Sequence, residues 1–286
     1  MESLIPSGGF FHNRRQAGNM RFLLANPAAL TTMKATAPTV PVAEPATLAE
    51  FRELLAHCPH VLGNGSNTLI VTPPSLVAIT RKLTRFSVLD TTIIAEAGVR
   101  LQTLIKVAAN HGLGGIEYLW SVPATVGGAV YMNAGRGIDH PESQIHTVVA
   151  RVLVYDRRRD FWLRRAECKF GYRTSIFHQR PEWKILAAEL SLPQKRREEV
   201  DRGIRERINY VKEHQDHTAP NAGSVFRSGY SDGPSLRSLQ FGRARMSGKT
   251  SNWLLNDFGP ATDVLEVIKL VERHHSAPPE REIVVW

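Results

Sequence analysis

Hydrophobic residues recur along the first half of this chain in two rhythms, one typical of strands and one typical of helices. Five short apolar runs predict strands, at residues 39–44, 68–72, 76–81, 86–89 and 93–96. Residues 47–58 and 101–111 repeat apolar positions at helical spacing. Thr47 and Glu50 supply a T-x-x-E capping box for the first helix, and Gly112 ends the second. Strands that alternate with capped helices indicate α+β architecture rather than a helical bundle.

The second half continues in the same way and ends on a strand. Further strands are predicted at residues 146–155, 160–167, 183–192 and 282–286. A charged, helix-favouring stretch at 195–214 leads into a polar passage at 218–248, and Thr262 or Asp263 caps a last helix with an apolar face. Pro41 confines the first predicted strand to a sheet edge, because proline cannot donate a ladder hydrogen bond.

The N-terminal stretch and the overall composition limit the class of protein. Residues 1–30 show no sustained periodicity and predict a loose extension, with Met20 a candidate start of the folded part. The 286 residues are 42% hydrophobic and 22% charged, which is ordinary soluble composition. No apolar run approaches the ~20 residues that span a bilayer, and no apolar segment follows Arg14 and Arg15 as in a secretory signal. We therefore expect no membrane association.

The two cysteines and the charge bear on compartment and partners. Cys58 and Cys168 lack C-x-x-C spacing, so they fit a reducing, cytoplasmic compartment and offer neither a disulfide framework nor a metal site. A net charge of +9 favours anionic partners, and it gathers at residues 157–159, 164–165 and 195–197. Such clusters can bind nucleic acid, but at hairpin tips or helix starts they are more commonly solvated, so we expect no nucleic-acid partner. A small molecule that bears phosphates is attracted by the same positive charge.

Two glycine-rich turns, each after a strand-like run, are the candidate chemistry. Residues 116–135 read IEYLWSVPATVGGAVYMNAG, in which Gly127 and Gly128 permit positive φ or close approach of a ligand. GNGSN at residues 63–67 repeats the construction. Together they suggest one elongated anion held at two places, such as a dinucleotide pyrophosphate. Either turn alone is weak, since a glycine pair is more often a tight turn, and neither the Rossmann motif nor a P-loop is present.

Six stretches in order, from about residue 36 to the end, agree with one known family. They are LGNGSNTLIV, EAGVRLQTLIKVAANHGLGGIEYLWSVPATVGGAVYMNAG, CKFGYRTSIF, PNAGSVFR, ATDVLEVI and REIVVW. The sequence resembles the UDP-N-acetylenolpyruvoylglucosamine reductases (MurB), within the wider class of flavoproteins related to vanillyl-alcohol oxidase. Each stretch alone is a weak signal, but six in order make coincidence improbable.

The resemblance implies a bipartite α+β FAD-binding fold followed by an α+β substrate domain. The implied units are residues 31–85 and 86–194 for FAD and 195–286 for the substrate, with the last strand returning to the flavin. It also implies non-covalent FAD, NADPH as reductant and a UDP-sugar substrate, and we expect a monomer. The implied cofactor-binding residues are Gly63, Asn64, Gly65, Ser66, Asn67, Gly98, Val99, Pro123, Ala124, Thr125, Gly127, Gly128, Asn133 and Ala134.

The resemblance also implies a catalytic set. Arg173 in GYRTS would fork onto a carboxylate, Ser224 in NAGSVF would donate a proton, and Glu282 in EREIV would assist if partly protonated. Tyr172, Lys212 and Arg227 are the implied substrate-binding residues. Singly, these residues are more often a surface charge, a turn serine and a solvated glutamate. Their joint occurrence inside matching motifs favours the functional interpretation.

Departures from the family pattern keep alternatives open. Thr31-Thr32, Ala124 and Thr250-Ser251 replace an asparagine-threonine, a glycine and a histidine-alanine of the family. The longer members of the family carry an insertion with a substrate-clamping tyrosine after the strand near Phe177. Only residues 178–182 occupy that place here, so the sequence predicts the shorter type of reductase. The leading hypothesis is an enolpyruvyl reductase. The alternatives are a related FAD-dependent oxidoreductase with another substrate, and a basic binding protein that has lost the cofactor site.

Overall fold

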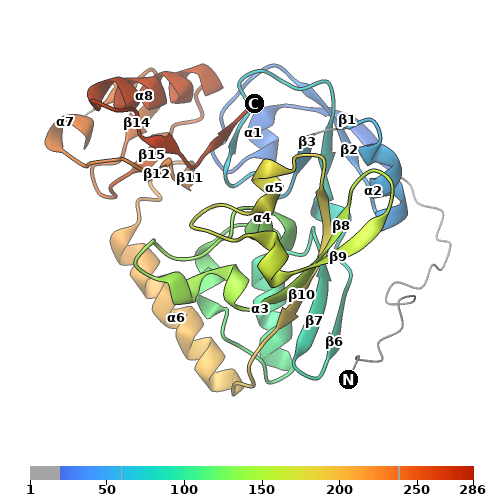
Figure 1. Ribbon diagram of the computed structural model, residues 1–286. Coiled ribbons are helices and arrows are strands. Elements are labelled where there is room, and N and C mark those ends of the chain that lie inside the picture. The colour runs from blue at the N-terminus through green and yellow to red at the C-terminus, as the bar shows by residue number, and fades with distance from the viewer. Residues whose placement is uncertain (1–19, 59, 238) are drawn as a thin grey trace.

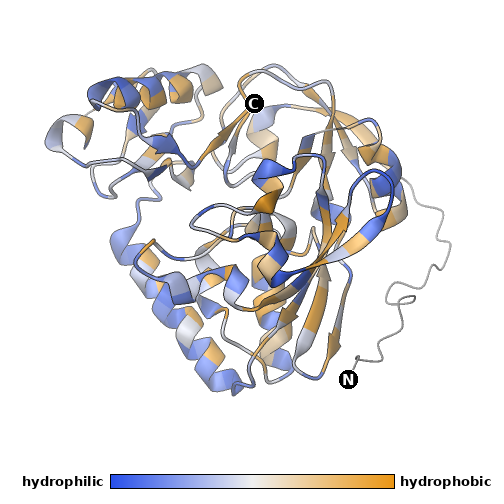
Figure 2. Cartoon of the chain, viewed as in Figure 1, coloured by the Kyte–Doolittle hydropathy of each residue, from blue (hydrophilic) through white to orange (hydrophobic). Residues whose placement is uncertain are grey.

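The strands form three larger sheets with helices on their faces (Figure 1). The computed structural model describes residues 20–58, 60–237 and 239–286. Orange, apolar positions concentrate where sheets and helices meet, and blue ones on the outer helix faces (Figure 2). The α+β class predicted from the sequence is confirmed. No helix in the described ranges has the length and apolar character needed to cross a membrane.

The first sheet has the strand order β1-β2-β5-β3. These strands are β1 (Arg21–Ala25), β2 (Val40–Glu44), β5 (Val77–Ile79) and β3 (His60–Leu62). β1 and β2 are antiparallel, whereas β5 runs parallel to β2 and to β3. The helices are α1 (Pro27–Leu30) and α2 (Leu48–Leu55). The predicted capping box is confirmed, since Thr47 Oγ1 accepts from Glu50 N–H and the Glu50 carboxylate accepts from Thr47 N–H.

Two predictions for this part are wrong. Residues 21–30 are not a loose extension but form β1 and α1, which begins at Pro27 with the Asn26 side chain as its cap. Four or five residues are too few to show a period. β2 is not an edge strand, because it lies between β1 and β5. Pro41 is tolerated there because pairing with β5 begins only at Val42. Residues 1–19 of the predicted extension lie outside the described residues.

The second sheet is antiparallel, with the order β6-β7-β10-β8-β9. Its strands are β6 (Phe86–Leu89), β7 (Thr92–Glu96), β10 (Lys184–Ser191), β8 (Val149–Tyr155) and β9 (Asp160–Arg164). Its helices are α3 (Leu101–Asn110), α4 (Val126–Tyr131) and α5 (Ile176–Gln179). Short 3-10 turns are η1 (Thr80–Lys82), η2 (Glu117–Ser121), η3 (Pro141–Ser143), η4 (Ile145–Thr147) and η5 (Arg165–Cys168). Leu101, Leu104 and Ile105 of α3 are fully buried in one core with the sheet, as their helical spacing predicts.

We call residues 215–281 the C-terminal lobe. It contains the third sheet. The sheet order is β11-β15-β14-β13, with β11 (Asn221–Ser224), β15 (Trp253–Asn256), β14 (Ala244–Met246) and β13 (Gln240–Phe241). The long helix α6 (Arg197–His214) leads into the lobe, which also contains α7 (Pro234–Arg237) and α8 (Ala261–His274). The predicted apolar face of α8 is buried. Its predicted cap is wrong, because Pro260 occupies the N-cap and the Asp263 carboxylate accepts from Arg243 N–H instead.

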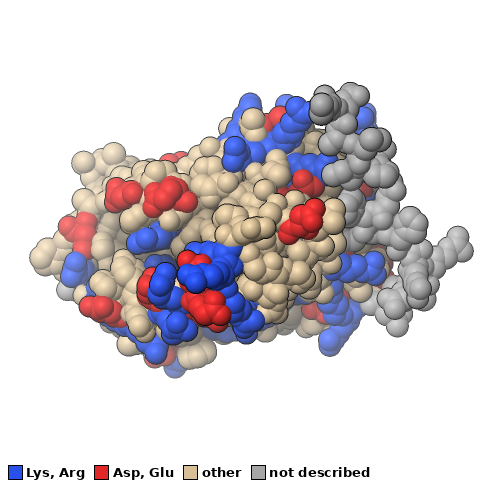
Figure 3. All heavy atoms as spheres, turned by 90° about the horizontal axis from the view of Figure 1, so that it is seen from below, with Lys and Arg blue, Asp and Glu red and all other residues tan. Residues whose placement is uncertain are grey.

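Ion pairs balance part of the basic charge found in the sequence. On α6, Arg197 pairs with Asp201 one turn on, and Arg202 pairs with Glu206. Basic and acidic side chains are interspersed on the face seen from below (Figure 3). Exposed pairs of this kind contribute little to stability, typically about 0–1 kcal/mol each. On α6, therefore, part of the basic charge is paired along an exposed helix face.

Two short pairings return the chain from the C-terminal lobe to the first glycine turn. β12 (Phe226–Ser228) pairs with β16 (Glu280–Arg281), and β4 (Thr68–Leu69) pairs in parallel with β17 (Val284–Val285). Asn67 Nδ2 donates to the carbonyl of Glu282 at 2.9 Å. The last strand therefore lies beside the first glycine turn, and it is shorter than the predicted residues 282–286.

Candidate active site

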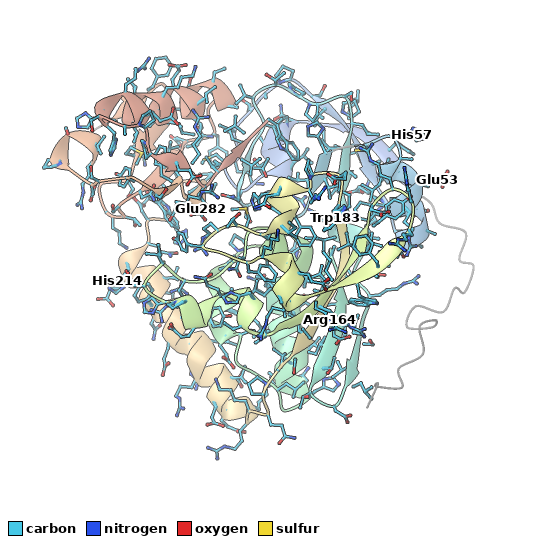
Figure 4. All side chains as sticks on the ribbon, viewed as in Figure 1. Glu53, His57, Arg164, Trp183, His214 and Glu282 are labelled. Atoms are coloured by element: carbon cyan, nitrogen blue, oxygen red, sulfur yellow. The ribbon has the colours of Figure 1, made fainter. Side chains whose placement is uncertain are left out.

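One large cavity lies where the three sheets meet, with a volume of about 1240 Å³. Both glycine turns, the segment after α4, residues 172–173, β11 and the C-terminal residues line it. Figure 4 shows Glu282 in the space between the C-terminal lobe and the rest of the molecule. Because ordinary ligand pockets are about 300–1,000 Å³, this cavity has room for more than one small ligand.

The two glycine turns lie against each other. Asn64 Nδ2 donates to the carbonyl of Pro123 at 2.7 Å. A Cβ on Gly63 would lie 2.5 Å from Thr125 Oγ1, so only glycine permits this contact. Gly65 has φ +65°, and a Cβ there would lie 2.3 Å from the carbonyl oxygen of Leu30. The turns are 59 residues apart along the chain, yet they form one wall of the cavity.

The Gly127–Gly128 pair serves a different purpose from the one expected. Neither residue has positive φ. Gly127 allows the start of α4 to pack against β7, since a Cβ would lie 2.8 Å from that of Ala97, whose carbonyl accepts from Gly127 N–H. Around Gly128 a Cβ would meet only Thr125 Oγ1, at an ordinary 3.6 Å. The first glycine is therefore required by packing, and the second leaves an open patch of backbone in the cavity wall.

Arg173 is the most constrained charged group in the cavity. Its Nε donates to Glu282 Oε1 at 2.8 Å, and both side chains are only 12% exposed. Nη2 donates to the carbonyls of Gly135 and Arg136 at 3.0 and 3.1 Å, and Nη1 to that of Asn133 at 3.4 Å. Four of its five N–H groups are thus engaged within the protein. The two-pronged contact with a substrate carboxylate expected from the sequence is not available, but a single Nη1 hydrogen bond and the positive charge remain.

Glu282 has one carboxylate oxygen bound to Arg173 and one without a partner among the described residues. Oε2 is buried and has no hydrogen-bond partner among the described residues. Burial raises the pKa of Glu282, although the guanidiniums of Arg173 and Arg227 act in the opposite direction. The backbone N–H of Glu282 donates to the carbonyl of Val225 at 2.8 Å, which brings β11 and Ser224 to the same wall. Arg173, Ser224 and Glu282 thus meet at one cavity.

Most of the other predicted residues also line the cavity. These are Asn64, Gly65, Ser66, Asn67, Pro123, Ala124, Thr125, Gly128, Ala134 and Tyr172. Tyr172 packs its ring under the Arg173 guanidinium, 4.9 Å from its centroid. The predicted pyrophosphate turns and the predicted catalytic set therefore share one space.

Five predicted residues do not line the cavity. Gly98 packs so tightly that a Cβ would lie 1.8 Å from the carbonyl of Thr80, and Val99 belongs to the core. Asn133 is fully buried behind the wall. The remaining two are substrate candidates: Lys212 is exposed on α6, and Arg227 pairs with Glu280 while its Nη1 donates to the Arg173 carbonyl.

Two arginines that sequence reasoning missed do line the cavity. Arg136 lies 6.0 Å from the ring centroid of Tyr210 and Arg207 lies 5.1 Å from it, so the two guanidiniums share one aromatic ring. Arg207 Nε donates to Ser121 Oγ, and burial together with nearby Arg136 lowers the pKa of Arg207. Neither arginine forms an ion pair within the described part of the chain. The only sequence signal was their positions, directly after NAG and on the charged helix.

The cavity fits a polar, elongated ligand. Thr32 Oγ1, His60 Nδ1 and Glu282 Oε2 are buried and lack hydrogen-bond partners among the described residues, and all three residues line the cavity. Buried polar atoms are rarely left unsatisfied, so residues in the cavity wall retain unused hydrogen-bonding capacity. The described residues contain no cluster of three or more histidines, cysteines or carboxylates that could hold a metal ion.

Comparison with known proteins agrees with these features. The family described as FAD binding domain matches residues 41–158, the part that contains both glycine turns. The fold and the paired turns thus define an FAD-binding protein.

The relatives define the family more narrowly. UDP-N-acetylenolpyruvoylglucosamine reductase of Pseudothermotoga lettingae is 34% identical over 251 residues, covering 81% of this chain and 86% of that protein. The reductase of Moorella thermoacetica is 37% identical over 248 residues, covering 79% and 78%. The crystal structure of MurB from Thermus caldophilus matches with a TM-score of 0.79 and 29% identity, over 94% of this chain and 100% of that one. The chain belongs to the UDP-N-acetylenolpyruvoylglucosamine reductase family.

Proposed function

We propose that this chain reduces the enolpyruvyl ether of UDP-N-acetylglucosamine enolpyruvate to UDP-N-acetylmuramate, a step of peptidoglycan precursor synthesis. The family membership supports the activity. The observation that carries the assignment to this site is the Arg173–Glu282 pair beside Ser224, in the cavity that the two glycine turns also line. When bound, the flavin of FAD takes hydride from NADPH and supplies it to the enolpyruvyl double bond.

The residues of this chain handle charge and the proton. Negative charge develops beside the substrate carboxylate during hydride addition, and preorganised positive charge stabilises such a transition state most. Arg173 supplies that charge and one Nη1 hydrogen bond, since its other N–H groups are engaged. Ser224 Oγ donates the proton to the carbon next to the carboxylate. Burial raises the pKa of Glu282, which favours its protonated form, and in that form Glu282 stabilises the charge left on the serine oxygen.

The finer substrate contacts are part of the same proposal. Arg136 and Arg207 line the cavity with no ion-pair partner within the described residues, so they suit the diphosphate of the UDP-sugar. Lys212, expected to do this from the sequence, is exposed on α6 instead. Because the glycine turns lie within residues 31–194 and Ser224 and Arg207 lie within residues 195–286, we assign the first range to FAD and the second to the substrate. Two buried free cysteines support a reducing, cytoplasmic setting.

An anaerobic flavin titration tests the function. The purified protein is expected to be yellow, to bleach on addition of NADPH and to recover its flavin spectrum when UDP-N-acetylglucosamine enolpyruvate is added. A flavin that bleaches but is not reoxidised by this substrate would instead favour the alternative, a related oxidoreductase with another substrate. A colourless protein that does not take up FAD would contradict both.

A further inference from the structure

Asn133 connects the end of α4 to the segment that carries Arg173. Its side chain is fully buried, yet every polar atom has a partner. Nδ2 donates to the carbonyl of Gly171 at 2.8 Å and to Gln144 Oε1 at 2.7 Å. Oδ1 accepts from the backbone N–H of His146 at 3.2 Å. Asn133 does not line the cavity, where the sequence suggested that it would bind the cofactor.

The segment beginning at Asn133 holds Arg173 at both ends. The carbonyls of Asn133, Gly135 and Arg136 accept hydrogen bonds from the guanidinium. At the other end, the Asn133 amide binds Gly171, two residues before Arg173, in a turn where Gly171 and Thr174 exchange backbone hydrogen bonds. Within that turn Arg173 has φ 52°, a left-handed conformation that is costly for a non-glycine residue and persists only where its surroundings enforce it.

We propose that Asn133 is a positioning residue for Arg173, fixing the backbone turn from which the guanidinium reaches Glu282 and the substrate carboxylate. The proposal rests on the function proposed above, because it takes the role of Arg173 from there. Removing the Asn133 amide leaves the Gly171 carbonyl with only the Thr174 N–H as partner and relaxes the turn, while the glycine turns that face the cofactor stay in place.

Two substitutions remove the amide without adding backbone strain. Asn133 has φ 45°, which glycine and aspartate both tolerate. Asn133→Gly deletes the side chain. Asn133→Asp keeps its shape and its acceptor for His146 N–H, but a carboxylate cannot donate to Gly171 or Gln144. The matched control is Asn256→Ala, because Asn256 is equally buried and donates to the carbonyls of Met33 and Gly259.

The two half-reactions are measured separately by anaerobic stopped flow. Both Asn133 variants are expected to bind FAD and to be reduced by NADPH at rates within about twofold of the unaltered enzyme. Reoxidation by UDP-N-acetylglucosamine enolpyruvate is expected to slow by at least about tenfold, because only that step uses Arg173. Asn256→Ala is expected to lower the melting temperature with no selective loss of reoxidation.

The Arg173→Lys background separates positioning from general stability. If Asn133 acts through Arg173, adding Asn133→Gly to Arg173→Lys slows reoxidation by less than about twofold further, since coupled residues are not additive. Full additivity, equal loss in both half-reactions or unchanged reoxidation in the Asn133 variants would overturn the proposal. So would failure of both Asn133 variants to fold while Asn256→Ala folds. If Arg173→Lys itself reoxidises normally, the proposed role of Arg173 fails instead.

Discussion

Single residues at this site depart from ordinary protein conformation and ionisation. Arg173 has left-handed φ, and Glu282 is buried with one oxygen unpartnered among the described residues. Such features are costly and collect where surrounding structure enforces them, as at binding and catalytic sites. Around Arg173 the cost is offset by four hydrogen bonds to a carboxylate and three carbonyls. The geometry of the charged pair is therefore prepared before any ligand arrives.

Removing the hydroxyl of Ser224 separates the two half-reactions. In Ser224→Ala, reduction by NADPH is expected to persist, while reoxidation by the enolpyruvyl substrate slows by about 10²- to 10⁴-fold, the usual contribution of a positioned proton donor. Rapid-mixing absorbance of the flavin measures both. Ser228→Ala is the control, because Ser228 is exposed and binds Glu280. Equal slowing of both half-reactions would remove Ser224 from its assigned role.

The raised pKa of Glu282 predicts a loss of rate at high pH. As pH rises through that pKa, the protonated fraction falls, so reoxidation by the substrate slows. In Glu282→Gln the amide does not titrate. Reoxidation is therefore expected to be slower at every pH and no longer to fall as the pH rises. Single-turnover rates between about pH 5 and 9 measure it. The control is Glu266→Gln on α8, which is expected to keep the fall in rate at high pH. If Glu282→Gln kept the same fall, the pH dependence would belong to another group.

Sequence reasoning located the charged centre but not all of its contacts. The motifs around Arg173, Ser224 and Glu282 are local, so the residues could be found one by one. Arg136 and Arg207 could not, because they meet at one ring only after a loop and a helix 71 residues apart fold together. The same holds for the side chain of Asn133, whose partners lie 11 and 38 residues away.

At the scale of elements, length decided what the sequence could predict. α2 and α3 were predicted to within about three residues, because helices of eight and ten residues repeat their apolar positions over several turns. β1 and α1 were missed because five and four residues show no period. The position of β2 inside its sheet depends on β5, more than thirty residues later, which no local pattern reveals.

The first glycine turn is an element whose shape only glycine allows. In Gly65→Ala the left-handed φ costs about 1–3 kcal/mol and the methyl group collides with the Leu30 carbonyl, so the turn must shift. We expect the dissociation constant for FAD to rise by at least about tenfold. Titration of the apoprotein with FAD, followed by flavin fluorescence, measures it.

Two glycines serve as controls for this change. Gly112 also has positive φ, +68°, but a Cβ there meets nothing within 4 Å, so Gly112→Ala isolates the conformational strain. Gly248→Ala carries neither the strain nor a collision. If Gly65→Ala bound FAD as tightly as Gly112→Ala, the shape of the turn would not matter for the cofactor.

At the scale of the whole molecule, the fold disfavours protonation of several histidines. Burial lowers the pKa of His60, His146 and His178 below the ordinary value. Below about pH 6.5 the unfolded chain therefore binds protons that the folded chain does not, and stability is lost as pH falls. Buried Glu96 and Glu282, whose pKa values are raised, act in the opposite direction.

The contribution of one histidine can be isolated by substitution. The His178 ring packs against that of Tyr131, with ring centroids 4.1 Å apart and the planes tilted by 34°. Between about pH 7 and 5.5, His178→Gln is expected to lose less free energy of unfolding than the unaltered protein, because the neutral amide does not protonate. Denaturant titrations at both pH values measure the difference. His57→Gln is the control, since His57 is exposed beside α2 (Figure 4), and equal losses in all three proteins would refute the idea.

The chain crosses between the C-terminal lobe and the remainder twice, at the end of α6 and again at residues 282–284 before β17. The lobe is also held by packing, because Met33, Ala35 and Leu69 share its apolar core and Asn256 Nδ2 donates to the carbonyl of Met33. Close-packed side chains resist displacement, so the wall that carries Ser224 and Glu282 is braced against the chain between α1 and β2 of the first sheet.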